Sequence, residues 1–233
     1  MAGGKGTRLL PITSAIPKPL VPVGEHPILH YVLTWLSNCG VKRVILAINH
    51  LAEIICAVVG DGARWGLKVE YSIEDSPLGT IGPLRLLHDL PPNFLVINGD
   101  ILTDLSLGDF FEYHTANDAL LTVATFKRSH NVDFGVLHFS DSTCELNGFE
   151  EKPMLEYSVS MGIYGMRREI LSFIPEDKPM GLDTLVGALL TTHNTIKVYK
   201  HEGRWLDIGR LEDYLYANSD EIKPCLEEML GRK

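Results

Sequence analysis

The residues best suited to bind phosphate lie at the start of the chain. Positions 2–6 hold three glycines, Gly3, Gly4 and Gly6. Glycine accepts positive φ angles, so successive backbone N–H groups can turn toward one anion. Arg8 follows two residues later and can donate two parallel hydrogen bonds to phosphate oxygens, and Lys18 stands between two prolines that stiffen its backbone. The pattern predicts an anion site, whereas a lone glycine turn would have only solvated charges nearby.

A carboxylate follows an apolar stretch in the middle of the chain. Residues 93–98 read NFLVIN and lead into Gly99 and Asp100. Carboxylates at the C-terminal ends of buried strands lie where ligands bind in open α/β sheets. The alternative is that Asp100 only caps the next turn. Asp100 is therefore a candidate to act with the cations of the opening segment.

The elements that must position these residues alternate between helix and strand patterns. Helical spacing of apolar residues covers 27–38, 51–59, 105–114 and 183–190, and strand patterns cover 41–48, 69–73, 93–98, 120–127, 159–166 and 196–200. This alternation predicts an α/β fold with a mostly parallel sheet. Residues 134–139 and 146–150 are predicted to pair as an antiparallel hairpin, and 211–230 to form a charged amphipathic helix or helix pair.

The opening segment differs from two common phosphate-binding motifs. It lacks the Gly-Lys-Ser/Thr of a P-loop and the G-x-G-x-x-G of a dinucleotide fold. Its longer pattern, GGKGTRL, then PIT and PKPLVPV, resembles the signature of the sugar-phosphate nucleotidylyltransferases. The resemblance implies that Arg8 and Lys18 are catalytic and neutralise phosphate charge, and that the nucleoside triphosphate is held by Ala2, Gly3, Gly4, Gly6, Thr7 and Arg8.

The same resemblance places Glu74 and Gly79 in the loop that holds the base. A carboxylate has two acceptor oxygens and no donor. Guanine offers two adjacent donors, N1–H and N2–H, whereas uracil and thymine offer one donor between acceptors. Glu74 therefore favours guanine, and the PLGTIGPL form of the loop looks most like the guanylyltransferase branch.

Four residues of the second half match the family positions for the sugar phosphate. Gly135 matches a backbone position near the sugar, and Glu151 and Lys152 belong to an EKP motif. The implied roles are Glu151 on sugar hydroxyls and Lys152 on the phosphate. Ser160 stands where asparagine is common, and serine reaches less far, so the sugar stays open.

The resemblance further implies a magnesium ion bound by Asp100 and Asp207, the latter within a W-L-D-I-G stretch. Mg²⁺ is commonly held by one or two carboxylates with phosphate oxygens and water. The two residues are far apart in the sequence, so the sequence alone does not bring them together. A structural role for Asp207 in a turn beside Gly209 is the alternative.

The implied fold is Rossmann-like (GT-A-like), with a mixed, mostly parallel sheet flanked by helices. In the family an apolar strand leads into the glycine loop, but here Met1 directly precedes Ala2. Either that strand precedes the printed sequence, or it is absent and the sheet lacks a central member. Residues 1–233 are expected to form one catalytic domain without the C-terminal β-helix of some relatives.

Composition limits the remaining classes of function. A net charge of −9 disfavours binding to nucleic acid or to an anionic membrane, and no apolar run resembles a membrane span or a leader peptide. The four cysteines are scattered, which indicates reduced thiols and a cytoplasmic protein. The expected partners are an NTP, GTP first, and a sugar 1-phosphate, and a homo-oligomer is left open.

Three functions remain in competition. The first is a guanylyltransferase for mannose 1-phosphate or a heptose 1-phosphate. The second is a uridylyltransferase or another nucleotidylyltransferase acting on a different sugar phosphate. The third is a catalytically weak homologue that binds a nucleotide sugar and regulates a partner.

Overall fold

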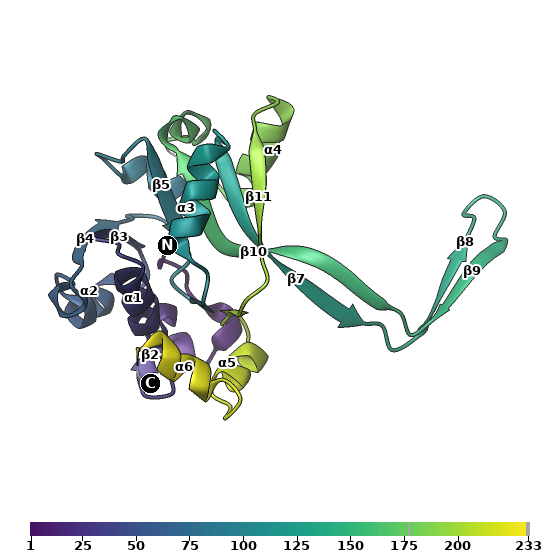
Figure 1. The fold of residues 1–233 in the computed structure, drawn as a ribbon, viewed down its shortest axis with the longest axis horizontal. Coiled ribbons are helices and arrows are strands. Elements are labelled where there is room, and N and C mark those ends of the chain that lie inside the picture. The colour runs from purple at the N-terminus through teal and green to yellow at the C-terminus, as the bar shows by residue number, and fades with distance from the viewer. Residues whose placement is uncertain (177, 232–233) are drawn as a thin grey trace.

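The computed structural model describes residues 1–176 and 178–231 and has a mixed α/β architecture (Figure 1). The helices are α1 Ile28–Asn38, α2 Ala52–Val59, α3 Leu107–Ala116, α4 Leu182–Thr191, α5 Leu211–Ala217 and α6 Lys223–Met229. The strands are β1 Pro22–Val23, β2 His26–Pro27, β3 Arg43–Ile48, β4 Lys68–Ile73, β5 Asn93–Ile97, β6 Ile101–Thr103, β7 Leu121–Asn131, β8 Gly135–Phe139, β9 Leu146–Glu151, β10 Met154–Arg167, β11 Ile196–His201 and β12 Trp205–Asp207.

The largest sheet has the order β11–β7–β10–β5. β7 and β11 run parallel, while β10 is antiparallel to both of its neighbours. Helix α3 covers this sheet with the fully buried Phe110, and its His114 is 2.8 Å from the hydroxyl of Thr122 on β7. The predicted mixed α/β fold is confirmed, but parallel pairing is less extensive than expected because β10 returns directly alongside β7.

Three shorter pairs complete the body of the molecule. β3 and β4 pair in parallel, β6 and β12 pair antiparallel, and β1 and β2 form a short antiparallel ladder. Helix α1 packs its apolar face, which includes Leu29 and Leu33, into the main core. In the part of the chain described here, no helix combines the length and apolar character needed to cross a bilayer.

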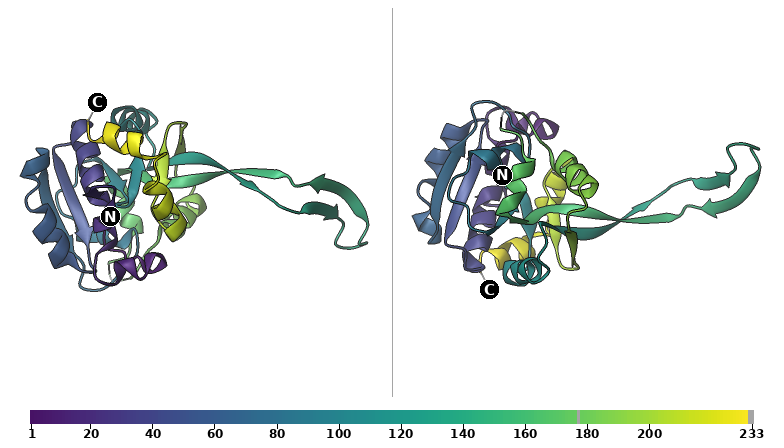
Figure 2. Two further views of the ribbon diagram at one scale, coloured as in Figure 1. Left: turned by 90° about the horizontal axis from the view of Figure 1, so that it is seen from below. Right: turned by 90° about the horizontal axis from the view of Figure 1, so that it is seen from above.

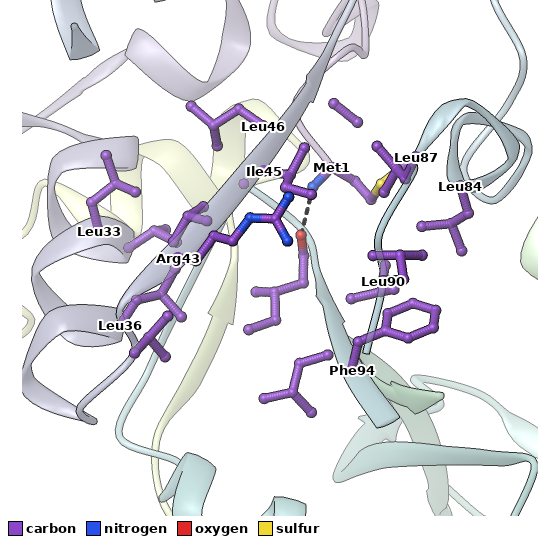
Figure 3. A pocket seen from close by; sticks show the side chains of 18 of the residues that line it. Met1, Leu33, Leu36, Arg43, Ile45, Leu46, Leu84, Leu87, Leu90 and Phe94 are labelled. Atoms are coloured by element: carbon purple, nitrogen blue, oxygen red, sulfur yellow. Dashed lines mark hydrogen bonds between the residues drawn. The ribbon is translucent and has the colours of Figure 1, made fainter. Parts of the chain in front are cut away.

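A cavity of about 480 Å³ lies between β3 and β5, and we call it the slot (Figure 3). Within the described residues, β3 pairs with β4 alone and β5 with β10 alone, so no other strand runs along their facing edges. Met1 donates its amine to the carbonyl of Ile97 at 2.7 Å, and Ala2 donates its N–H to Ala47 at 2.8 Å. Gly99 returns a bond to the Met1 carbonyl at 2.8 Å.

These bonds have the pattern of a parallel ladder, because Met1 both donates to and accepts from the backbone around Asn98. Met1 and Ala2 therefore occupy the last positions of a strand that would run parallel to both β3 and β5. The remainder of that strand position is the slot, lined by apolar side chains such as Leu46, Leu90 and Phe94 (Figure 3). Among the described residues, the position between β3 and β5 is thus held only by Met1 and Ala2.

Residues 125–160 form a long projection that we call the arm (Figures 1 and 2). Its proximal half is the outer part of β7 paired with β10, from Thr125 opposite Ser160 to Asn131 opposite Met154. Its tip is the β8–β9 hairpin, close to the range predicted from sequence. No residue of the arm is buried, although it carries several exposed apolar side chains: Phe134, Leu137, Phe139, Leu146, Phe149, Met154, Leu155 and Tyr157.

Candidate functional site

The glycine segment forms a turn that wraps around Lys18. Gly6 adopts a left-handed conformation with φ of 61°, which favours glycine. A Cβ at Gly6 would lie 2.9 Å from Cγ2 of Thr13 and 3.0 Å from Cβ of Lys18. The hydroxyl of Thr13 donates to the Gly6 carbonyl at 2.8 Å. This glycine therefore allows the turn to pack directly on the segment that carries the lysine.

Lys18 is buried and forms an ion pair with Asp100. Lys18 comes from a short 3₁₀ turn, Lys18–Leu20, that begins after Pro17, and Asp100 follows β5. A buried ammonium group is costly to desolvate unless a carboxylate compensates it. The pair therefore links the opening segment to the C-terminal end of β5.

Asp207 reaches the same place through the β6–β12 ladder. It pairs with Ile101, and the N–H of Ile208 donates to the carbonyl of Asp100 at 3.1 Å. Burial raises the pKa of Asp207, and the nearby charge of Asp100 raises it further, while Lys18 and Arg8 act in the opposite direction. The structure therefore brings together the two acidic residues that lie far apart in the sequence.

Arg8 lies at the edge of this cluster. A Cβ on Gly209 would be 3.6 Å from Nη2 of Arg8 and 3.4 Å from Oδ1 of Asp207. The guanidinium and this carboxylate thus flank one glycine, and Gly209 leaves room between them. Two cations and two carboxylates meet beside the glycine turn.

The carboxylates provide a donor set that fits Mg²⁺. Within the described residues, no group of three or more His, Cys, Asp or Glu side chains could hold a metal ion. Mg²⁺ needs only one or two carboxylates when phosphate oxygens and water complete its octahedron. The raised pKa of Asp207 agrees with this conclusion. The pKa is raised partly because two carboxylates lie near each other, and a bound cation would reduce their repulsion.

A cavity of about 390 Å³ opens beside the cluster, and we call it the cleft. Asp100, the glycine turn and the loop after β4 contribute to its walls. The lining residues are Met1, Gly3, Gly4, Lys5, Asn49, Glu74, Pro77, Gly79, Thr80, Asn98 and Asp100. A Cβ on Gly4 would meet no atom within 4 Å, whereas Ala2 is buried and Thr7 is exposed. Of the residues predicted to hold the nucleotide, Gly3, Gly4, Glu74 and Gly79 line the cleft, whereas Ala2, Gly6, Thr7 and Arg8 are not among its lining residues.

Glu74 is a buried carboxylate in the wall of the cleft. Its Oε2 accepts the N–H of Leu78 at 3.0 Å, and its carbonyl accepts from Nδ2 of Asn49 at 2.9 Å. Burial raises its pKa, and the Leu78 hydrogen bond opposes that shift. A Cβ on Gly3 would approach Oε1 to 3.1 Å, so Gly3 keeps this oxygen uncovered on the side of the glycine turn.

Gly79 has a packing role as well as a place in the cleft. Its φ is 80°, and a Cβ there would lie 2.7 Å from the carbonyl of Met180. The backbone N–H of Ile81 donates to the same carbonyl at 2.9 Å. Glycine at this position therefore lets the loop dock on the segment before α4.

Ser160 is the one predicted sugar residue that lies near the acidic cluster. Its hydroxyl is 3.0 Å from the hydroxyl of Tyr164. Burial raises the pKa of Tyr164, the Ser160 hydrogen bond opposes this shift, and Asp100 and Asp207 raise it further. Tyr164 is opposite Val96 on β5, so the Ser160–Tyr164 pair lies beside the end of the strand that leads to Asp100.

Gly135, Glu151 and Lys152 lie elsewhere, at the distal hairpin of the arm (Figure 1). Gly135 opens β8, Glu151 closes β9, and Lys152 follows with φ of 46°. The structure does not bring these three residues to the cleft of the same chain. The reason is the continuous pairing of β7 with β10 from Thr125–Ser160 to Asn131–Met154, which carries the hairpin away from the body.

Two cleft residues were missed by the analysis of sequence. Asn49 follows β3 and Asn98 follows β5, and both line the cleft. Their signal was the same as that of Asp100, because each polar side chain comes directly after an apolar strand. A Cβ on Gly162 would lie 2.6 Å from Nδ2 of Asn98, so Asn98 is also packed closely against β10.

Comparisons with known proteins agree with this arrangement. Residues 1–223 match the family described as nucleotidyl transferase. The chain is 29% identical over 222 residues to mannose-1-phosphate guanyltransferase of Yarrowia lipolytica and 31% identical over 223 residues to probable mannose-1-phosphate guanylyltransferase 1 of Oryza sativa subsp. japonica. Each alignment covers 92% of this chain but only 61% and 62% of the respective relative.

Solved structures with the same fold include HddC of Yersinia pseudotuberculosis. Its crystal structure superposes with a TM-score of 0.72 and 28% identity, covering 93% of this chain and 95% of HddC. HddC complexed with GMP-PN gives a TM-score of 0.71. With the glycine turn, the paired cations and the strand-end carboxylates in place, this chain belongs to the nucleotidyl transferase family.

Proposed function

We propose that this chain transfers GMP from GTP to a sugar 1-phosphate of the mannose or heptose type. The products are a GDP-sugar and pyrophosphate. The observation that carries the proposal is the meeting of Arg8, Lys18, Asp100 and Asp207 beside a glycine turn. The names of the relatives, mannose-1-phosphate guanyltransferase, and the HddC complex with GMP-PN support guanine as the base.

The reaction needs no nucleophilic side chain. An oxygen of the sugar phosphate, already an anion at neutral pH, forms a bond to the α-phosphorus of the NTP. The bond from that phosphorus to the oxygen shared with the β-phosphate breaks, and its electron pair leaves with pyrophosphate. The barrier lies in bringing anions together and stabilising the leaving charge, so positioned cations can provide the catalysis.

Each cation has a distinct place in this proposal. Lys18 is fixed by burial next to Asp100 and provides a point charge at the floor of the site. Arg8 is exposed at the rim and can grip phosphate oxygens with two hydrogen bonds. Mg²⁺ held by Asp100 and Asp207 would supply further neutralisation of the phosphates.

Base recognition is assigned to the wall that holds Glu74 and Gly79. One oxygen of Glu74 holds Leu78, which fixes the orientation of the carboxylate. The other oxygen and the remaining lone pairs can accept from two adjacent donors, as guanine presents them. A uridylyltransferase stays the alternative, because uracil would use only one such contact.

The proposal treats residues 1–233 as one catalytic domain of a cytoplasmic enzyme. Ser160 contacts the sugar phosphate from the base of the arm, and Gly135, Glu151 and Lys152 contact it from the distal hairpin. The chain spans about 61% of the length of the curated relatives that it matches. The activity of those longer proteins therefore supports the proposal only as a comparison.

The test is pyrophosphate release from ATP, CTP, GTP or UTP with mannose, heptose and glucose 1-phosphates. We expect GTP to be preferred, and Arg8→Ala and Asp100→Asn to lower turnover roughly 100-fold or more. Asp109→Asn and Arg64→Ala are matched controls, since both side chains are exposed outside the cleft. Near-normal turnover in both site variants would refute the mechanism, UTP preference would favour the alternative, and nucleotide-sugar binding without turnover would indicate a regulatory homologue.

A further inference from the structure

Four exposed apolar side chains of the arm tip share one face of the β8–β9 hairpin. Leu137 is directly opposite Phe149, and Phe139 is opposite Leu146. Side chains alternate between the two faces of a strand, so Leu137 and Phe139 share a face. All four side chains are more than half exposed. We call this set the apolar face of the arm.

Glu151 lies on the same face. It is opposite Gly135, two positions along from the Leu137–Phe149 pair. A Cβ on Gly135 would lie 2.7 Å from the ring of Phe149 and 3.3 Å from Oε2 of Glu151. Whatever covers the apolar face therefore also meets Glu151, and Lys152 follows immediately.

This face needs a cover. An isolated two-stranded hairpin is marginally stable in water, and contiguous exposed apolar side chains mark interaction surfaces. The body of the same chain is a poor candidate, because the ladder from Phe126–Val159 to Asn131–Met154 carries the arm away from the body (Figure 2). Folding the tip back over its own cleft would break these pairs.

The cleft of the same chain lacks the predicted sugar-phosphate residues that the arm carries. Ser160 reaches the acidic cluster, but the predicted sugar-phosphate residues Glu151 and Lys152 are absent from the same chain's cleft. Two exposed apolar side chains lie close in sequence to site residues, namely Leu10, two positions after Arg8, and Ile73, directly before Glu74. These side chains match the apolar face of the arm in chemistry.

We propose that two copies of this chain form a two-fold dimer in which each arm covers the cleft of the other copy. The apolar face packs at the partner's cleft rim, and Glu151 and Lys152 complete the partner's sugar-phosphate site. A two-fold axis makes the exchange reciprocal, so both sites are completed at once. The roles of Glu151 and Lys152 in this dimer rest on the proposed function. The prediction that a second copy covers the arm does not.

Mixing two inactive variants tests the exchange. Asp100→Asn disables the cleft, and Lys152→Ala disables the arm. Separately, each should have little activity. In a re-equilibrated equal mixture, half of the dimers combine the two chains, and one of their two sites pairs an intact cleft with an intact arm, so about a quarter of wild-type activity should return.

Two controls define the opposite result. A mixture of Asp100→Asn with Lys18→Met should stay inactive, because both changes affect the cleft. If the first mixture also stays inactive while unchanged chains exchange freely, the arm acts on its own chain and the proposal is wrong. If Lys152→Ala alone keeps wild-type turnover, the arm makes no catalytic contribution and the inference is wrong, whereas GMP transfer itself is unaffected.

Molecular mass separates this inference from the proposed function. Light scattering should give a dimer, and Leu137→Glu should convert it to a monomer. Ser142→Glu places the same charge in the turn between β8 and β9, off the apolar face, and should leave the dimer unchanged. A monomeric parent chain would overturn the exchange even if GTP-dependent turnover is found, and a dimer without turnover would overturn only the function.

Discussion

Filling the slot between β3 and β5 should stabilise this protein strongly. The perturbation is an extension of six apolar, β-branched residues placed directly before Met1, which matches the six residues of β3. Its backbone would continue the parallel ladder that Met1 and Ala2 begin. Its side chains would fill the apolar cavity of about 480 Å³.

One contribution to this stabilisation comes from the amine of Met1. In the folded chain, burial lowers its pKa from 8.0 to about 6, against the raising effects of Asp100 and Glu74. A shift of two units corresponds to about 3 kcal/mol. An extension converts this amine into a neutral amide and removes that penalty. Each buried Val or Ile side chain adds about 1.5–3 kcal/mol, offset by about 1–2 kcal/mol per residue of backbone ordering.

The sign of the pH effect follows from the lowered pKa. Between pH 6 and 8, the unfolded chain binds more protons at Met1 than the folded chain. Stability of the chain beginning at Met1 should therefore rise with pH across this window and fall as pH drops toward 6. The advantage of the extended chain should accordingly be about 3 kcal/mol larger at pH 5.5 than at pH 8.5.

Denaturant unfolding at both pH values measures this difference. A Gly-Ser extension of equal length is the control, since it removes the amine charge without filling the slot. We expect it to flatten the pH dependence and to give less stability than the apolar extension. Equal unfolding midpoints for the two extensions would refute the idea that the slot accepts a strand.

Three further predictions concern single residues. Burial lowers the pKa of His114, so the free energy of unfolding should fall as pH drops below about 6.5, and His114→Gln should remove that part of the dependence in denaturation curves at pH 5 and 7. Glu74→Gln replaces one acceptor oxygen by a donor, so the kcat/KM preference for GTP over UTP should fall roughly tenfold or more, and an unchanged ratio would contradict base reading by this carboxylate. Gly6→Ala meets both Thr13 and Lys18 with φ of 61°, so thermal melting should show a loss of about 1–3 kcal/mol, and retention of full stability would show that the turn relaxes freely.

Local pattern was sufficient for much of the fold. The apolar spacing of 27–38 and 41–48 predicted α1 and β3, which the structure forms as Ile28–Asn38 and Arg43–Ile48. The hairpin at 134–150 was predicted equally well, because strand alternation and turn residues act over short distances. What local pattern did not contain was how far β7 and β10 would continue together, since a long ribbon depends on pairing between distant segments.

The site divides in the same way. The glycine turn and the cations are local features, so the sequence indicated them without a fold. The approach of Asp207 to Asp100 depends on the β6–β12 ladder, and only the folded chain contains that pairing. The positions of Glu151 and Lys152 depend on what covers the arm, which a single sequence does not reveal. Asn49 and Asn98 were within reach of the strand-end rule and were overlooked.

The ion pair between Lys18 and Asp100 means that the unliganded site supplies its own counter-ion. A divalent ion arriving alone would have to displace an ammonium group that has no second anion waiting for it. A triphosphate that binds together with the ion would give Lys18 new anionic partners when the carboxylate of Asp100 binds the ion. The ion and the nucleotide should therefore bind cooperatively, and each should raise the affinity of the site for the other by the same factor.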